Sequence, residues 1–419
     1  MLATLPLFAT KKEQFIAFCV AISLFCLSLG YEYFKYQRFT QESLHVDFAT
    51  VLNHYQKQKK NGRLYDVYKL KVESGEVFHT TSWTHKDIGV GARVKVKYKV
   101  EKLDFVDYLK GFFAVSFYIF EPDDTVKNLR QKLYGWVEKQ HSDSGMSELY
   151  NALFFAKSIS KENRDNVQKW GISHLVAISG FHLGVLSFLL YFLLNPIYRF
   201  FQDRYFPYRN RTLDISAVVF TTLFAYMYII DFTPSFLRAF IMSLVGFYLV
   251  SKSVKILSFS NLLITIFIAL IISPKLVFSI SFWLSVSGVY FIFLFLYHFG
   301  DKNKWFIFFV LNVWVYLLMM PIVHFIFSVF TPLQLFSPIL SILFVLFYPL
   351  SMLLHVVGFG DVLDEFLKTF LAYNSSVYSL SVSMEFLSLY IVLCLASIKW
   401  RFLSYVCLIF ACGTLFFIQ

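Results

Sequence analysis

The feature that most constrains this chain is a series of apolar runs, each long enough to cross a lipid bilayer. A helix of about 20 apolar residues spans the ~30 Å hydrocarbon core. The runs of roughly this length are residues 14–30, 174–194, 214–231, 235–251, 256–273, 277–299, 305–329, 334–356, 385–399 and 401–418. Hydrophobic residues make up 57% of the chain and charged residues only 16%, against about 25% in soluble domains. The sequence therefore predicts a polytopic α-helical membrane protein and argues against a soluble enzyme.

Basic residues predict the orientation of these runs. Lys11 and Lys12 precede the first run, so the positive-inside rule places the N-terminus in the cytoplasm and residue 31 onward outside. No small-residue cleavage site follows, so we expect residues 1–30 to be an uncleaved anchor. Alternating crossings from residue 174 place three basic connections on the cytoplasmic side. Their cations are Arg199, Arg204, Arg209, Arg211, Lys252, Lys255, Lys302 and Lys304. We therefore expect a multi-pass protein of the cell inner membrane.

This alternation fails after residue 330, because it would place Lys399 and Arg401 outside. Two alternatives restore them to the cytoplasm. Either residues 362–384 make an additional crossing, or the proline-containing run 334–356 is broken or re-entrant. The sequence leaves this choice open.

Residues 31–122 have a different pattern, made of short runs rich in β-branched and aromatic residues. These runs are 44–54, 63–72, 76–83, 92–100 and 112–120, with glycine-containing turn signals between the earlier ones. They predict a small extracytoplasmic β-barrel or sandwich. Residues 123–170 contain two amphipathic stretches, which we expect to form helices that lie at the membrane interface or pack on the bundle.

One predicted strand carries a basic face. Side chains alternate along a strand, so Val94 and Val96 face one side of 92–100 and the cations face the other. The cations are Arg93, Lys95, Lys97 and Lys99, and nearby aromatic candidates are Tyr65, Tyr68 and Trp83. Cations interleaved with aromatic rings suit single-stranded nucleic acid. A solvated strand face, or a face attracted to anionic lipid headgroups, fits the same residues.

The membrane part holds two polar motifs. In Trp170–His182, two histidines, two serines and two glycines stand at the outer entrance of a predicted helix. Ser179 and Gly180 would allow the backbone to open toward a polar ligand. His174 and His182 could donate hydrogen bonds or bind a metal, although two histidines eight apart without a carboxylate are also typical of a satisfied helix entrance.

The second motif follows Asp231 and contains Ser235 and Arg238. Arg238 stands one turn inside a predicted span, where an ionisable residue is by default a functional candidate. It could instead extend to the surface or pair with Asp231. Hydroxyl residues, including Ser281 and Ser285, recur in the 277–299 run, where they suit either a polar lining or close helix packing.

Catalytic and metal motifs are missing from the sequence. It contains no phosphate-binding loop, no H-E-x-x-H and no G-x-S-x-G. All five cysteines lie in apolar runs near the two ends. We therefore expect no enzyme activity, no cofactor and no metal centre.

The motifs resemble those of a known family. GISHLVAISGFHLGV (171–185) is similar to the signature of the ComEC competence proteins, the inner-membrane DNA channels of natural transformation. Pro234-Ser235 with Arg238-Ala239 resembles a later element of that family, and 281–285 resembles its aromatic-x-Leu-Ser element, with Trp283 where glutamine is more usual. Met320-Pro321 resembles its proline-marked late helices. The resemblance covers roughly 147–400.

The resemblance also implies an organisation for the whole chain. Family members typically carry an OB-like β-domain after a first anchor, so the resemblance implies an anchor over 1–30, an OB-like domain over 31–122, interfacial helices over 123–170 and a channel over 171–419. Many members continue into a β-lactamase-like domain. This sequence ends at Gln419 without that domain's histidine motif, so we expect a separate protein to degrade the second strand if any does.

Together these features predict transport of single-stranded DNA into the cytoplasm. The expected DNA path contains His174, Ser179, Gly180, His182, Ser235, Arg238, Ser281 and Ser285. Expected partners are membrane lipid, an extracytoplasmic DNA receptor and a cytoplasmic DNA-binding or helicase protein, and a homo-oligomer stays open. A small-molecule or lipid transporter, and a non-conducting scaffold, are the alternative functions.

Overall fold

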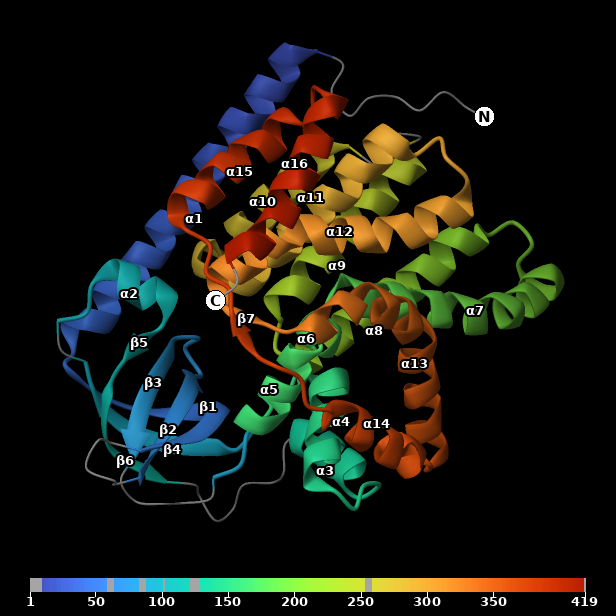
Figure 1. Ribbon diagram of the computed structural model, residues 1–419. Coiled ribbons are helices and arrows are strands. Elements are labelled where there is room, and N and C mark those ends of the chain that lie inside the picture. The colour runs from blue at the N-terminus through green and yellow to red at the C-terminus, as the bar shows by residue number, and fades with distance from the viewer. Residues whose placement is uncertain are drawn as a thin grey trace.

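The computed structural model describes residues 10–58, 64–82, 88–100, 102–120, 129–252 and 258–417 (Figure 1). Within these residues, seven helical segments are long and apolar enough to cross a membrane. They are α1 (Lys11–Gln41), α7 (Gly180–Tyr205), α8 (Arg211–Ile229), α9 (Pro234–Ser251), α11 (Ile280–Phe299), α12 (Lys304–Ile326) and α13 (Ser337–Val357) with the 3-10 turn η2 (Pro332–Phe336) before it. Each overlaps one of the predicted runs, although α1 and α7 extend well past the ends of 14–30 and 174–194, so the predicted helices are confirmed in these segments.

Three predicted spans correspond to shorter helices. Residues 256–273 contain α10 (Phe259–Ile272), 385–399 contain α15 (Met384–Ala396), and 401–418 contain α16 (Arg401–Gly413) followed by η4 (Thr414–Phe417). At 1.5 Å per residue, the 14 residues of α10 reach about 20 Å, less than the bilayer core. Serines begin α10 and α15, since Ser258 and Ser383 each accept a backbone N–H at the helix start.

After residue 330 the structure contradicts an additional crossing over 362–384 and a break in 334–356, whereas a re-entrant 334–356 stays a prediction. α13 continues as one helix through Pro349, so 334–356 is not broken. Residues 362–384 contain only the eight-residue α14 (Asp364–Leu371) and the strand β8 (Tyr378–Ser379), which pairs with β7 (Val329–Phe330). An amphipathic helix of eight residues is too short to provide the additional crossing.

The N-terminal β-structure is one six-stranded sheet. Its strands are β1 (Leu44–Gln58), β2 (Leu64–Val72), β3 (Val77–Ser82), β4 (Arg93–Lys99), β5 (Phe112–Phe113) and β6 (Val115–Phe120), in the spatial order β5-β3-β2-β1-β4-β6. The predicted alternation in β4 is confirmed, because Val94, Val96 and Tyr98 are fully buried in the core of the sheet.

The prediction of a closed barrel is not met, because the sheet stays open. The single strand expected at 112–120 is divided at Ala114: β5 pairs in parallel with β3, and β6 pairs antiparallel with β4. The two edges approach each other, since Ser116 Oγ donates to the Thr81 carbonyl oxygen at 3.2 Å. Among the described residues, however, no ladder joins β3 to β6.

Helix α1 connects the sheet to the helical bundle (Figure 1, blue). Its N-terminal part packs on α10, where Ser28 Oγ donates to the Ile271 carbonyl oxygen at 2.7 Å. Its C-terminal part covers the sheet core through Tyr36 and Phe39. α2 (Phe105–Lys110) lies beside it at the same junction.

Between the sheet and α7, the described residues form four short helices. They are α3 (Leu129–Glu138), α4 (Ser144–Phe155), α5 (Lys161–Lys169) and α6 (Ser173–Val176). α3 and α4 contribute Val137, Tyr150 and Phe154 to a buried cluster with α13. Tyr226 of α8 also donates to the Phe154 carbonyl oxygen at 2.7 Å, so this region is packed against the long helices.

Candidate functional site

The candidate site begins where the chain enters α7. α6 ends at Val176 and α7 starts at Gly180, so the backbone is non-helical between them. Ser179 caps α7 reciprocally with His182: the Ser179 N–H donates to His182 Nδ1 at 3.2 Å, and the Phe181 N–H donates to Ser179 Oγ at 3.3 Å. The serine and histidine of the motif thus fix a helix start in the interior.

Gly180 allows α7 to approach α9 closely. A Cβ atom at position 180 would lie 3.1 Å from the Ala239 Cβ and 3.4 Å from Arg238 Nη2. The first of these distances is shorter than an ordinary carbon–carbon contact of about 3.5–4.0 Å. The glycine therefore brings the α7 backbone next to the guanidinium of Arg238.

Arg238 is a buried cation that lies among hydroxyl, sulfur and apolar groups. Its side chain lies in the first turns of α9 with 3% of the residue exposed. Nε donates to Ser285 Oγ at 2.9 Å, and Nη1 lies 3.7 Å from the Met242 sulfur. Within the described part of the chain, no carboxylate forms an ion pair with it. Burying an unpaired charge is costly, so this arginine is unusual for a residue that only packs.

Asp231 forms ion pairs with residues other than Arg238. Its Oδ1 accepts Lys71 Nζ of β2 at 2.7 Å and lies 3.6 Å from an Arg130 guanidinium nitrogen of α3. The alternatives in which Arg238 pairs with Asp231 or extends to the surface are therefore wrong. Asp231 instead joins the sheet and the short helices to the α8–α9 connection.

Hydroxyl groups of α11 complete this side of the site. Ser235 Oγ and Ser281 Oγ lie 2.8 Å apart, and Ser285 is the partner of Arg238. Five of the predicted path residues, Gly180, Ser235, Arg238, Ser281 and Ser285, thus meet where α7, α9 and α11 come together. Ser179 adjoins them through the helix cap.

The two histidines face a different element, α13. His174 Nε2 lies 3.1 Å from Ser341 Oγ, and its Nδ1 lies 3.1 Å from the Gly171 carbonyl oxygen. The His182 ring is fully buried and its centroid lies 4.6 Å from that of Tyr348. His182 Nε2 has no hydrogen-bond partner among the residues that the structure describes. The structure therefore places the histidines against α13, whereas Arg238 lies between α7, α9 and α11.

The outer face of β4 forms a second candidate surface. Lys95 stands between Phe48 of β1 and Phe120 of β6, and Lys97 stands between Val46 and Tyr118. All four of these apolar and aromatic neighbours are exposed, between 37% and 49%. The surface therefore alternates cations with accessible rings.

The ends of β4 extend this surface. Lys99 stands between Leu44 and Val115, which are both exposed. Arg93 is less available, since it donates to Glu73 and lies 4.4 Å above the Phe48 ring. Lys95 and Lys97, next to exposed rings, are thus the cations of this face that are best placed to meet a ligand.

The aromatic partners predicted for this face differ from the observed ones. Tyr68 is fully buried and stacks on His54, and Tyr65 lies on β2, which β1 separates from β4. Trp83 lies outside the described residues. The rings that accompany the lysines are Phe48, Tyr118 and Phe120, which only the strand register identifies.

The fold and the site together are those of a mostly helical protein with an appended β-sheet domain, several helices long and apolar enough to cross a membrane, and a buried cation beside a helix break. A family model described as "Competence protein" matches residues 155–419, and the chain belongs to this family. Membership points to a role in DNA uptake. The family and the seven apolar helices are consistent with a multi-pass membrane protein.

One curated relative is similar over part of the chain. "Uncharacterized protein MG316" of Mycoplasma genitalium is 33% identical over 141 residues, which cover 32% of this chain and 34% of the relative. The chain thus matches about a third of the length of that relative. No solved structure matches the chain.

Proposed function

We propose that this protein conducts single-stranded DNA across the cytoplasmic membrane during DNA uptake. The observation that carries the proposal is Arg238, a guanidinium held between α7, α9 and α11 with hydroxyl and sulfur partners and no carboxylate partner in the described residues. A DNA strand carries one negative charge per ~3.4 Å, and arginine recognises phosphate oxygens through its planar set of donors. Phosphate is therefore a fitting counter-ion for this cation.

In this proposal the site opens before it conducts. Ser235, Ser281 and Ser285 bond to one another or to Arg238, so the helices are closed around the cation. Separation of α7 from α9 would expose Arg238 and free these hydroxyls for phosphate and water. Gly180 suits such a movement, because no side chain at this position interlocks with α9. The role is conduction rather than catalysis.

The sheet is the proposed capture surface. Its order, with the divided β5 and β6 taken as one fifth strand, resembles an OB-fold, in which a strand face binds single strands. Lys95 and Lys97 would pair with phosphates, while Phe48, Tyr118 and Phe120 would stack on bases. This assignment places the sheet outside the cell membrane and the N-terminus in the cytoplasm.

The proposed partners follow from this arrangement. DNA would arrive from an extracytoplasmic receptor, and a cytoplasmic helicase or DNA-binding protein would draw it inward. No phosphate-binding loop for ATP occurs in the sequence, so the pulling force is assigned to that partner.

The test is a deletion strain complemented with variants and supplied with labelled DNA. We expect loss of the chain, or Arg238→Gln, to abolish cytoplasmic entry while outer uptake persists. Arg164→Gln, which removes an exposed charge from α5, is the matched control and should import normally. Normal entry with Arg238→Gln and His174→Ala at equal expression would favour a non-conducting scaffold. Transport of a small molecule or lipid without any dependence on DNA would favour the other alternative.

A further inference from the structure

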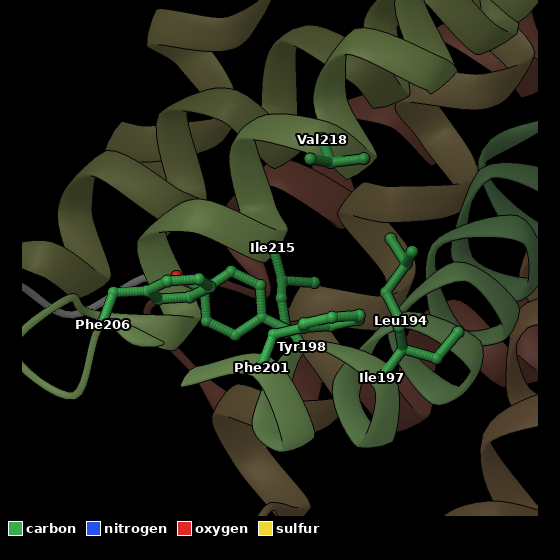
Figure 2. Close-up of a pocket in the computed structure, with 7 residues that line it drawn as sticks. All are labelled: Leu194, Ile197, Tyr198, Phe201, Phe206, Ile215 and Val218. Atoms are coloured by element: carbon green, nitrogen blue, oxygen red, sulfur yellow. The ribbon is translucent and has the colours of Figure 1, made fainter. Parts of the chain in front are cut away.

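An apolar crevice lies between α7 and α8 (Figure 2), and none of its lining residues belongs to the Arg238 site. Its walls are Leu194, Ile197, Tyr198 and Phe201 of α7, Phe206 of the connection, and Ile215 and Val218 of α8. Its volume is about 190 Å³, below the ~300–1,000 Å³ of sites that enclose a drug-sized ligand. A space of this size and lining suits part of an acyl chain rather than a whole polar molecule.

Both walls of the crevice end on an arginine. On α7, Leu194, Ile197 and Phe201 follow helical spacing that continues to Arg204. On α8, Val218 and Ile215 continue in the same way to Arg211. The two helices are antiparallel neighbours joined by residues 206–210, so both arginines stand at the same end of the crevice.

These two arginines differ from their neighbours Arg199 and Arg209, which each lie beside a carboxylate. Arg209 neutralises Asp214 through two N–H groups at 2.7 and 2.8 Å, and Tyr198 donates to the same carboxylate. Arg199 lies 3.8 Å from Asp203. Among the described residues, neither Arg204 nor Arg211 forms an ion pair with a carboxylate. The mouth of the crevice therefore has a net positive charge.

We propose that this crevice binds an anionic phospholipid, with part of one acyl chain between α7 and α8 and the headgroup phosphate at Arg204 and Arg211. Basic pockets between membrane helices on the cytoplasmic side are suited to anionic headgroups, and buried methylenes add affinity. The positive-inside rule places the 206–210 connection on that side, where anionic lipid would be available. The inference requires a membrane protein but does not depend on DNA transport.

The experiment compares phosphatidylglycerol with phosphatidylcholine of the same acyl chains, added to the purified full chain in an uncharged detergent. Native mass spectrometry measures how much lipid stays bound. We expect at least about tenfold preference for phosphatidylglycerol, since two basic residues contribute about 1 kcal/mol each. Arg204→Gln and Arg211→Gln should each weaken its binding about fivefold, which corresponds to about 1 kcal/mol per basic residue. Val218→Trp, which fills the crevice, should weaken both lipids.

Arg199→Gln is the matched control, since it removes a charge from the same helix on a different face. It should change binding much less than the other two variants, and all variants should unfold at the wild-type temperature in lipid-free detergent. Equal retention of the two lipids would overturn the proposal. Equal losses of lipid binding with Arg199→Gln and Arg204→Gln would also overturn it. The same holds if the crevice is buried in a dimer and Val218→Trp leaves lipid binding unchanged.

Discussion

His141 and His355 face each other through their Nε2 atoms, which lie 3.0 Å apart. His355 Nδ1 lies 2.7 Å from the Ser351 carbonyl oxygen, which can only accept, so Nδ1 carries hydrogen. The Nε2 of a neutral His355 is then a lone pair, and His141 Nε2 must donate to it. On its other side, His141 Nδ1 lies 2.8 Å from Asp364 Oδ2. Because a hydrogen bond between His141 Nδ1 and Asp364 Oδ2 also needs a hydrogen, the His141–Asp364 pair holds one further proton.

This proton arrangement makes a prediction for Asp364. Burial raises the pKa of its carboxyl above the ordinary value of ~3.9, although the hydrogen bond to His141 opposes the shift. An amide can donate to His141 Nδ1 as the protonated acid does, so we expect Asp364→Asn to retain stability within about 1 kcal/mol. Asp364→Leu leaves a buried nitrogen unpaired and should cost about 1–3 kcal/mol.

Asp364→Asn also tests how the stability of the protein depends on pH. The pKa of Asp364 is higher in the folded state than in the unfolded chain. Its carboxyl therefore contributes its full stabilisation below the unfolded-state pKa and loses that contribution as the pH rises through the folded-state pKa. Thermal unfolding followed from about pH 4 to about pH 8 should therefore show wild-type protein losing stability relative to Asp364→Asn. Asp165→Asn, at an exposed carboxyl of α5, should keep the wild-type slope. Equal damage from Asp364→Asn and Asp364→Leu would contradict this account, because it would mean that the negative charge is essential.

Replacement of Arg238 by an apolar residue should abolish DNA import without lowering the thermal stability of the protein. Replacing buried ionic groups with apolar side chains is often neutral or stabilising by ~1–4 kcal/mol. We expect Arg238→Met to unfold at the wild-type temperature or higher, and to lose DNA import. Arg130→Met removes the donor to the Tyr228 carbonyl oxygen and should lower stability, which makes it the control. Unfolding of Arg238→Met at a markedly lower temperature would assign Arg238 a structural role.

Gly180 should be intolerant of a side chain. A Cβ atom added there would lie 3.1 Å from the Ala239 Cβ, so we expect Gly180→Ala to cost about 1–3 kcal/mol by overpacking. Ala239→Gly in the same chain should restore part of this loss. Gly184, one turn further along α7, has open space around it, so Gly184→Ala should be neutral or stabilising by up to about 1 kcal/mol. Equal effects at the two glycines, measured by thermal unfolding in detergent, would remove the close-approach explanation.

The β4 face should bind single-stranded DNA in a salt-dependent manner. For single strands the slope of log K against log salt changes by about 0.7 per phosphate contact. Lys95→Gln and Lys97→Gln should each reduce the slope of the full chain by about this amount. Lys139→Gln, which removes an exposed charge from the end of α3, should leave it unchanged.

The rings of the same face have a separate test. Phe120→Ala should weaken DNA binding at every salt concentration, since a base stacked on an aromatic ring contributes about 1–3 kcal/mol. Fluorescence anisotropy of a labelled oligonucleotide measures both effects. If the lysine variants lost binding to phosphatidylglycerol vesicles but bound DNA normally, the face would be a lipid surface instead.

Features that depend on local pattern could be predicted from the amino-acid sequence. The runs 235–251 and 277–299 became α9 and α11 within three residues at each end, because the length of an apolar run and its bounding prolines or serines act locally. The alternation in 92–100 identified the buried and basic faces of β4 for the same reason. Membership of the competence family was readable from 171–185, and the match over 155–419 confirms it.

Which residues contact one another could be seen only after the chain had folded. Arg238 and Ser285 are 47 positions apart, and Asp231 and Lys71 are 160 apart, so no local pattern could assign these partners. The rings beside Lys95 depend on the register of three strands. The length of α10 and the open edge of the sheet depend on where packing ends each element. Contacts between distant segments follow from how helices and strands pack. Hydropathy predicts only that a residue is buried, and does not predict which residue it contacts.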